Sequence, residues 1–488
     1  MKIKKSALLL IILVICHNSY ALNYITTAES ISWNGAYTSV SEGFESMLYN
    51  PAGLFMSPSK YGLNLFGTYG FRYYNNSIST DDVLKLLEMR INDQNATNLL
   101  STIIAGMPVT GFDMGFDVSL PNFMTYFKYA DFSLGFSILP KTNFTITIDK
   151  NLFVYLFQEL SLQNELTFKI NSTFFQYVDF NFVLSGRAKT LEKYMPVEAI
   201  YIGLTGHFYL PTVFVKAKLD ESSLSAFAWD NSYGLYGYRV KLKGNIQTNM
   251  NLIITEPVKA TNVVNRDLAG FNLQSFVTNS GSFGFGVGFD MGFIVQFNKY
   301  VRAGFSVTDL GFIIFPQSSR ISADIYMDVT FDPSSGATFD FTKISNDLIS
   351  GLQTSVNSGG ETIAYEFWLP NTSIRTGVGI LPVRSRYFDM IIAADLSLSD
   401  LNRMLIGDYP TFNLSIGMEI NPKVAFIEIP IRAAFNYNTQ VNAPSFSTGI
   451  GLYLGPVEME IGVKGLEALI KELGAQEICI GLDFKLEF

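Results

Sequence analysis

Residues 283–297 alternate over fifteen positions between large apolar side chains and mostly small or polar ones. Eight apolar side chains share one face, and glycines share the other with Asp290 and Gln296. Period two is the period of a β-strand, and fifteen residues far exceed the usual length of about five or six. No stretch of about 18 consecutive apolar residues follows residue 21, so helical spans are not expected. Because only helices and closed barrels satisfy every backbone group in lipid, the pattern predicts an all-β, transmembrane, antiparallel, up-and-down barrel.

The composition agrees with this prediction. Only 16% of the residues are charged, against about 25% in soluble domains. With 42 Phe and 25 Tyr, the chain can bury too much apolar surface to be disordered. The net charge of −9 makes nucleic acid an unexpected partner, since phosphate binding needs a basic surface.

Further alternating segments predict further strands. They lie at 61–73, 236–246 and 412–420, and turns at 421–423 and 438–444 would join three strands between 412 and 454. The three basic side chains of 236–246 must face the lumen or a loop, because a lipid-facing Lys or Arg costs about 2–4 kcal/mol. These three are Arg239, Lys241 and Lys243. Counting all such segments predicts about fourteen strands.

The last strand, 478–488, has an entirely apolar face that ends on Phe488. An apolar face at a soluble sheet edge would promote aggregation. The ending resembles the strand by which bacterial outer-membrane barrels are recognised for insertion. The resemblance implies that the barrel-assembly machinery is a partner, acting through Phe488, and that outer-membrane lipid surrounds the protein.

Residues 1–21 have the three parts of a secretory signal: early lysines, an apolar run, and Ser19-Tyr20-Ala21 before the cleavage site. We expect cleavage after Ala21 and export to the bacterial outer membrane. A lipoprotein signal acylated at Cys16 is the alternative, although Ile15 stands where a small residue is usual. Cleavage after Ala21 would leave Cys479 alone, without a disulfide partner.

Amphipathic helices are predicted in three insertions, at 81–104, 341–352 and 466–473. Each could pack over a barrel rim, or it could act as a lid or contact lipid. The predicted organisation is a signal peptide at 1–21, a hatch at 22–58 and a barrel at 59–488.

The segment before the first strand contains Gly35-Ala36 and then Asn50-Pro51-Ala52. This arrangement resembles the N-terminal hatch of the FadL-type and PorV-like outer-membrane proteins, and 286–315 resembles paired strands of the same branch. The resemblance implies a hatch and gate at Asn50, Pro51, Ala52 and Gly53. The family's arginine is absent beside Ala36, so no role is carried over for it. Independently, Pro51 followed by small residues predicts a tight irregular turn, and the many apolar residues of 33–56 require burial.

The sequence offers no catalytic group, so we expect no enzyme. His207 is the one histidine outside the signal, without a serine at the spacing of barrel hydrolases. No metal-ligand cluster, phosphate loop or dinucleotide motif is evident, so we expect no metal or cofactor. The FadL resemblance implies passive uptake of hydrophobic small molecules, such as long-chain fatty acids. A PorV-like secretion or shuttle partner, and a structural or adhesive surface barrel, remain alternatives.

Overall fold

The computed structural model describes most of the chain after residue 26. The described residues are 27–488 except 66, 89–93, 110, 120–121, 158–165, 231–234, 250–283, 316–317, 331–360, 364–365, 402–409 and 470–473. The predicted signal peptide and the helix predicted at 341–352 therefore lie outside the described residues. Among the described helices, none has the length and apolar character needed to cross a membrane.

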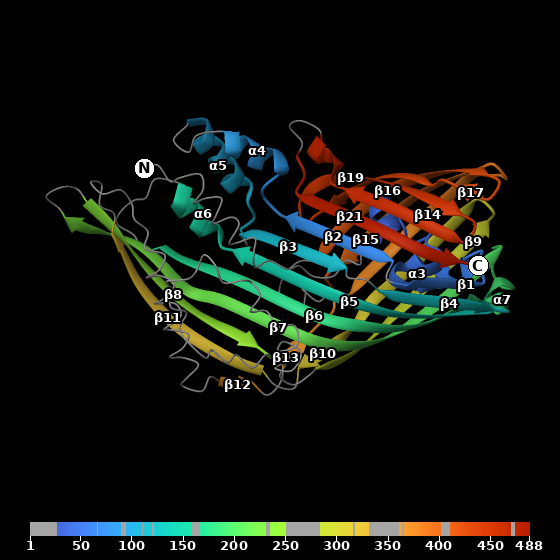
Figure 1. Cartoon of the computed structure of the whole chain (residues 1–488), viewed down its shortest axis with the longest axis horizontal. Coiled ribbons are helices and arrows are strands. Elements are labelled where there is room, and N and C mark those ends of the chain that lie inside the picture. Colours follow the sequence, from blue (N-terminus) through green and yellow to red (C-terminus); the bar gives the residue numbers. More distant parts are fainter. Residues whose placement is uncertain are drawn as a thin grey trace.

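Antiparallel strands close into a single ring (Figure 1). The ring has fourteen strand positions, and β21 closes it by pairing with β1 and β2. The predicted all-β antiparallel barrel of about fourteen strands is therefore confirmed. In ring order the positions are β1 (Tyr61–Leu65) with β2 (Thr68–Asn75), β3 (Phe112–Ser119) with β4 (Phe123–Tyr129), β5 (Phe132–Ile148), β6 (Leu166–Arg187), β7 (Ala199–Asp230), β8 (Leu235–Thr248) with β9 (Phe285–Asn298), β10 (Val301–Phe315) with β11 (Ser318–Thr330), β12 (Glu361–Ile363) with β13 (Glu366–Trp368) and β14 (Ser373–Arg384), β15 (Phe388–Ser399), β16 (Thr411–Val424), β17 (Ile427–Glu428) with β18 (Ile431–Asn438), β19 (Ala443–Leu454), β20 (Val457–Lys464), and β21 (Glu477–Glu487).

The two faces of the wall differ as the alternation predicted. Outward side chains are large, apolar and exposed, for example Phe182 (62% exposed), Phe289 (42%) and Phe484 (46%). The inward neighbours Asn181 and Asp290 are buried. An exposed apolar belt on a closed barrel is the surface that lipid covers.

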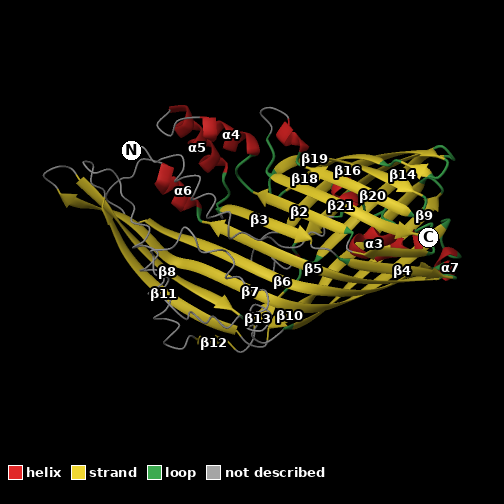
Figure 2. Ribbon diagram, viewed as in Figure 1, coloured by secondary structure: helices red, strands yellow, loops and turns green. Residues whose placement is uncertain are grey.

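Part of the barrel wall extends well beyond the rest at one end. Strands β6, β7, β8 and β11 extend past the rest, and three helices lie at that end (Figures 1 and 2). They are α4 (Thr80–Glu88), α5 (Gln94–Gly106) and α6 (Lys150–Phe157). Helices are thus confirmed within 81–104. The helical region contacts the strands through one apolar cluster. It contains Met107, just after α5, and Leu152 of α6, together with Phe112 of β3 and Ile148 of β5.

Three sequence predictions need correction. The turn expected at 421–423 lies later, at Ala425, because β16 continues through Pro422, whose carbonyl still accepts a hydrogen bond from the Ile429 N–H (3.1 Å). The strand expected at 61–73 is interrupted after Leu65, where Gly67 lies against the backbone of β21. Of the helix expected at 466–473, the described part is η5 (Leu466–Leu469), a single turn. The side chains of the basic triplet in β8 lie outside the described residues.

Candidate functional site

Residues 27–56 run inside the ring, and we call them the lumen segment. They form α2 (Ala28–Trp33), α3 (Gly43–Tyr49) and the 3₁₀ helix η1 (Pro51–Met56). In the figures, α3 lies within the barrel near the end that carries the C-terminus (Figure 2). Helix α2 packs against β19, β20 and β21, and η1 packs against β5, β6, β7 and β9. The segment therefore bridges opposite sides of the lumen.

The four residues expected to form a gate lie together within this segment. Asn50 is fully buried, and its Nδ2 donates to the carbonyls of Thr38 (2.8 Å) and Phe293 (3.2 Å). Its Oδ1 accepts from the Ala52 N–H (3.3 Å), which caps η1. Pro51 begins η1, where its missing N–H costs nothing. Asn50 thus ties the turn both to the segment itself and to the wall.

Wall glycines let the lumen segment approach the strands at backbone distance. A Cβ added at Gly203 would overlap the Pro51 backbone, and one added at Gly292 would overlap the Asn50 side chain. Eight further wall glycines would meet segment atoms within about 3 Å if they carried a Cβ: Gly62, Gly135, Gly304, Gly379, Gly417, Gly449, Gly462 and Gly481. In the strand where the sequence shows the alternation most clearly, Gly292 receives the segment, whereas Gly286 and Gly288 face Ile313 and Tyr209 of the wall.

Substituting Gly203 by valine is expected to displace η1. The added side chain has no room against Pro51, and overpacking of this kind costs about 1–3 kcal/mol. Hydrogen exchange of residues 50–56 in the purified barrel measures the displacement. Gly206→Val is the matched control, because the same strand has open space there. Equal exchange in the two variants would contradict the tight fit.

Two buried cations join the segment to the wall, and we call this group the charge cluster. The Arg432 guanidinium contacts Glu419 (2.6 Å), Glu460 (3.1 Å) and Glu29 of α2 (3.1 Å). Lys485 forms an ion pair with Glu45 of α3 and lies 3.7 Å from Glu29. Burial raises the pKa of Glu45 to about 7, and the ammonium of Lys485 opposes that rise. Four carboxylates thus share two cations, a balance that depends on both partners staying in place.

Two further wall carboxylates hold the backbone of the segment. Asp395 accepts from the N–H groups of Tyr37 (2.8 Å) and Thr38 (2.6 Å). Asp483 accepts from the N–H of Ala28 (2.7 Å) at the start of α2. Charged acceptors of this kind form the stronger class of hydrogen bond. The described links between the segment and the wall are hydrogen bonds, ion pairs and packing contacts, all of them noncovalent.

His207 lies in the lumen wall between two carboxylates. Its Nδ1 is 3.1 Å from Asp179 and its Nε2 is 2.9 Å from Asp290. Among the described residues, Asp179, His207 and Asp309 form the one group whose donor atoms could hold a metal ion, all within 4.8 Å. The Lys141 ammonium already lies 2.7 Å from Asp179 and supplies a positive charge there. The sequence spacing, which indicated no ligand cluster, did not reveal this group.

A protein-family model matches residues 51–458, which is most of the chain, and its description is "Family of unknown function (DUF5723)". The chain belongs to the DUF5723 family. No curated protein matches it.

Solved structures similar to this DUF5723 protein include two toluene transporters and a FadL homologue. The toluene transporter TbuX of Ralstonia pickettii is 9% identical over 95% of this chain and 98% of its own, with a TM-score of 0.43. The toluene transporter TodX of P. putida is 9% identical over the same shares, with a TM-score of 0.44. A FadL homologue of Pseudomonas aeruginosa is 9% identical over 96% of this chain and all of its own, with a TM-score of 0.30. Such distant likeness says nothing about what the DUF5723 protein binds.

Sequence reasoning missed the residues that hold the lumen segment. Arg432 and Lys485 each interrupt an apolar alternating strand on its inward face, and that is the signal by which they could have been found. Their partners Glu29 and Glu45 lie about 400 residues earlier in the chain. Only the closed ring brings them together in the DUF5723 fold.

Proposed function

We propose that this protein is an outer-membrane channel for passive uptake of small hydrophobic molecules, with the lumen segment as its gate. The observation that carries the proposal is a closed barrel whose lumen is occupied by its own N-terminal segment through noncovalent contacts. The predicted signal peptide and the apolar outer belt support residence in the outer membrane.

A hydrophobic ligand is supported by an aromatic cluster on the inward face of the long strands. Phe175 stacks on Trp368, with ring centroids 4.6 Å apart and planes 3° apart. Five more buried residues complete the cluster: Tyr177, Tyr209, Phe214, Ile313 and Phe315. Apolar and aromatic side chains are the usual lining of small-molecule sites. The cluster belongs to β6, β7, β10 and β13, the wall of the longer part of the barrel.

Replacing Asn50 by alanine tests the gate. The variant loses two hydrogen bonds to carbonyls, each contributing about 1 kcal/mol, so the undocked population should rise about tenfold or more. We expect faster uptake of a long-chain apolar probe by cells with matched surface abundance of the barrel. Heat-modifiable migration of the barrel should be unchanged.

Asn76→Ala is the matched control for this test. Asn76 is also buried, and its Nδ2 donates to Gly111, but it does not contact the lumen segment. Uptake that is unchanged in Asn50→Ala, or raised equally in the control, would argue against the gate. The secretion-partner alternative would then become the better hypothesis.

A further inference from the structure

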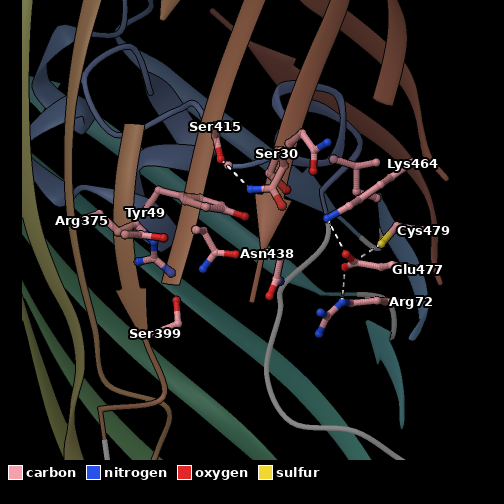
Figure 3. A pocket seen from close by; sticks show the side chains of 16 residues that line it. Ser30, Tyr49, Arg72, Arg375, Ser399, Ser415, Asn438, Lys464, Glu477 and Cys479 are labelled. Atoms are coloured by element: carbon pink, nitrogen blue, oxygen red, sulfur yellow. Dashed lines mark hydrogen bonds and ion pairs between the residues drawn. The ribbon is translucent and has the colours of Figure 1, made fainter. Parts of the chain in front are cut away.

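A small polar chamber lies beside the lumen segment (Figure 3). Its volume is about 60 Å³, enough for several water-sized groups when one needs about 10–15 Å³. The segment contributes Asn34 and Tyr49, and the wall contributes Arg375, Ser415 and Asn436. The chamber differs in chemistry from the aromatic cluster of the long strands.

Strand register builds the polar wall of this chamber. Ser415 lies opposite Asn436, which in turn lies opposite Ser445 on the next strand. One step along, Ser397 lies opposite Asn413, which lies opposite Asn438. Directly opposed residues of antiparallel strands share a face, so hydroxyl and amide groups from β15, β16, β18 and β19 gather at one place. None of these side chains carries a charge, and apart from Arg375 the charged residues that also line the chamber are ion-paired with one another, since Glu477 contacts both Arg72 and Lys464 (Figure 3).

Two amide oxygens in the chamber are left without a donor among the described residues. Asn34 uses its Nδ2 to donate to the Ser445 carbonyl (3.1 Å), and Asn436 uses its Nδ2 to donate to Ser415 Oγ (2.7 Å). The Oδ1 atoms of both residues are buried and accept no hydrogen bond there. Burying an acceptor in this way is unfavourable unless a donor arrives. Both residues line the chamber, at 5% and 3% exposure.

Arg375 supplies donors to the same chamber. Its Nη1 donates to Thr308 Oγ1 (2.7 Å), and its guanidinium lies 5.2 Å from the centre of the Tyr49 ring. Within the described part of the chain it forms no ion pair with a carboxylate. A guanidinium has five N–H donors, so most of them remain for a ligand. The chamber therefore presents unsatisfied acceptors and donors side by side.

We propose that the chamber binds a neutral, hydroxyl-bearing group, such as the glycerol end of a small ester, and that this group is the polar end of the channel's ligand. The glycerol end of a monoester carries two hydroxyl groups, each of which donates one hydrogen bond and accepts others, so together they can satisfy Asn34, Asn436 and Arg375. A carboxylate only accepts, so it would satisfy Arg375 and leave both amide oxygens without a donor. A pure hydrocarbon would satisfy none of the three. This inference rests on the proposed uptake function and narrows its ligand class.

The test compares two soluble probes with the same acyl chain, glycerol monobutanoate and butanoate, by calorimetry on the purified barrel in detergent. We expect the glycerol ester to bind at least tenfold more tightly. Asn436→Ser should weaken its binding about fivefold, the fold-change that corresponds to one lost hydrogen bond. Asn143→Ser is the matched control, because Asn143 is a buried wall asparagine that does not line the chamber.

Three outcomes would overturn the inference. Tighter binding of butanoate that is lost in Arg375→Gln would make the chamber an anion site. If neither probe binds saturably, the chamber holds only water. Equal weakening in Asn436→Ser and Asn143→Ser would mean a general effect on the barrel. Binding to purified protein does not require gating, so a failed uptake experiment and a failed binding experiment remain distinguishable.

Discussion

Replacing Arg432 by methionine is expected to detach α2 from the wall and to destabilise the barrel. The substitution leaves Glu29, Glu419 and Glu460 facing one another without their shared guanidinium. Removing one partner from buried ion pairs costs about 3–5 kcal/mol, because the remaining charges stay desolvated. The temperature of heat-modified migration should fall, and hydrogen exchange of residues 28–33 should accelerate by two orders of magnitude or more.

Arg187→Met is the control for that experiment. Arg187 also pairs with a glutamate, Glu192, at 2.8 Å, but this pair lies at the surface, with side chains 36% and 14% exposed. Exposed pairs contribute about 0–1 kcal/mol. If the two arginine variants behaved alike, the charge cluster would not be what holds the segment.

A disulfide between the segment and the wall is expected to abolish uptake. A Cβ at Gly35 would lie 3.8 Å from the Cβ of Ser415, within the range of about 3.5–4.5 Å found in disulfides. The pair Gly35→Cys with Ser415→Cys, in a Cys479→Ser background, should therefore lock the segment when oxidised. Uptake should return on reduction, and cellular uptake of an apolar probe before and after reductant measures both states.

The single variant Gly35→Cys separates the lock from backbone strain. Gly35 has φ +91°, where an L-residue is strained, so this variant alone can loosen the segment. It should respond to neither oxidant nor reductant. Full uptake through the oxidised double variant would show that molecules cross without movement of the segment.

Much of the fold was predictable because alternation is a local property of sequence. The apolar face of 285–297 and its glycine face are set by side-chain size alone, and both lie where that pattern placed them. The turn near Pro422 was misplaced because proline near the end of a strand can keep its carbonyl paired. The presence of a strand can be predicted from its own alternation. The residue at which it ends cannot, because that depends on pairing with the neighbouring strands.

The candidate site was predictable only in part. The Asn50-Pro51-Ala52 turn could be predicted from its proline and the small residues that follow. The wall residues that contact this turn could not be predicted. Gly203 and Gly292 make room for it because they have no side chain, and they lie on strands far along the chain. The chamber likewise depends on cross-strand register, which a single strand does not contain.

The position of the lumen segment constrains how the barrel can assemble. Residues 27–56 precede β1, yet α2 packs against β19, β20 and β21, which come last among the described strands in chain order. Because β21 completes the ring by pairing with β1 and β2, the first part of the chain would meet its binding surface only as the last strand arrives. Closure of the ring and insertion of the segment would then be a single late step, and a chain that closed without its segment would be left with glycine-lined hollows and with Asp395 and Asp483 lacking the backbone N–H groups that donate to them.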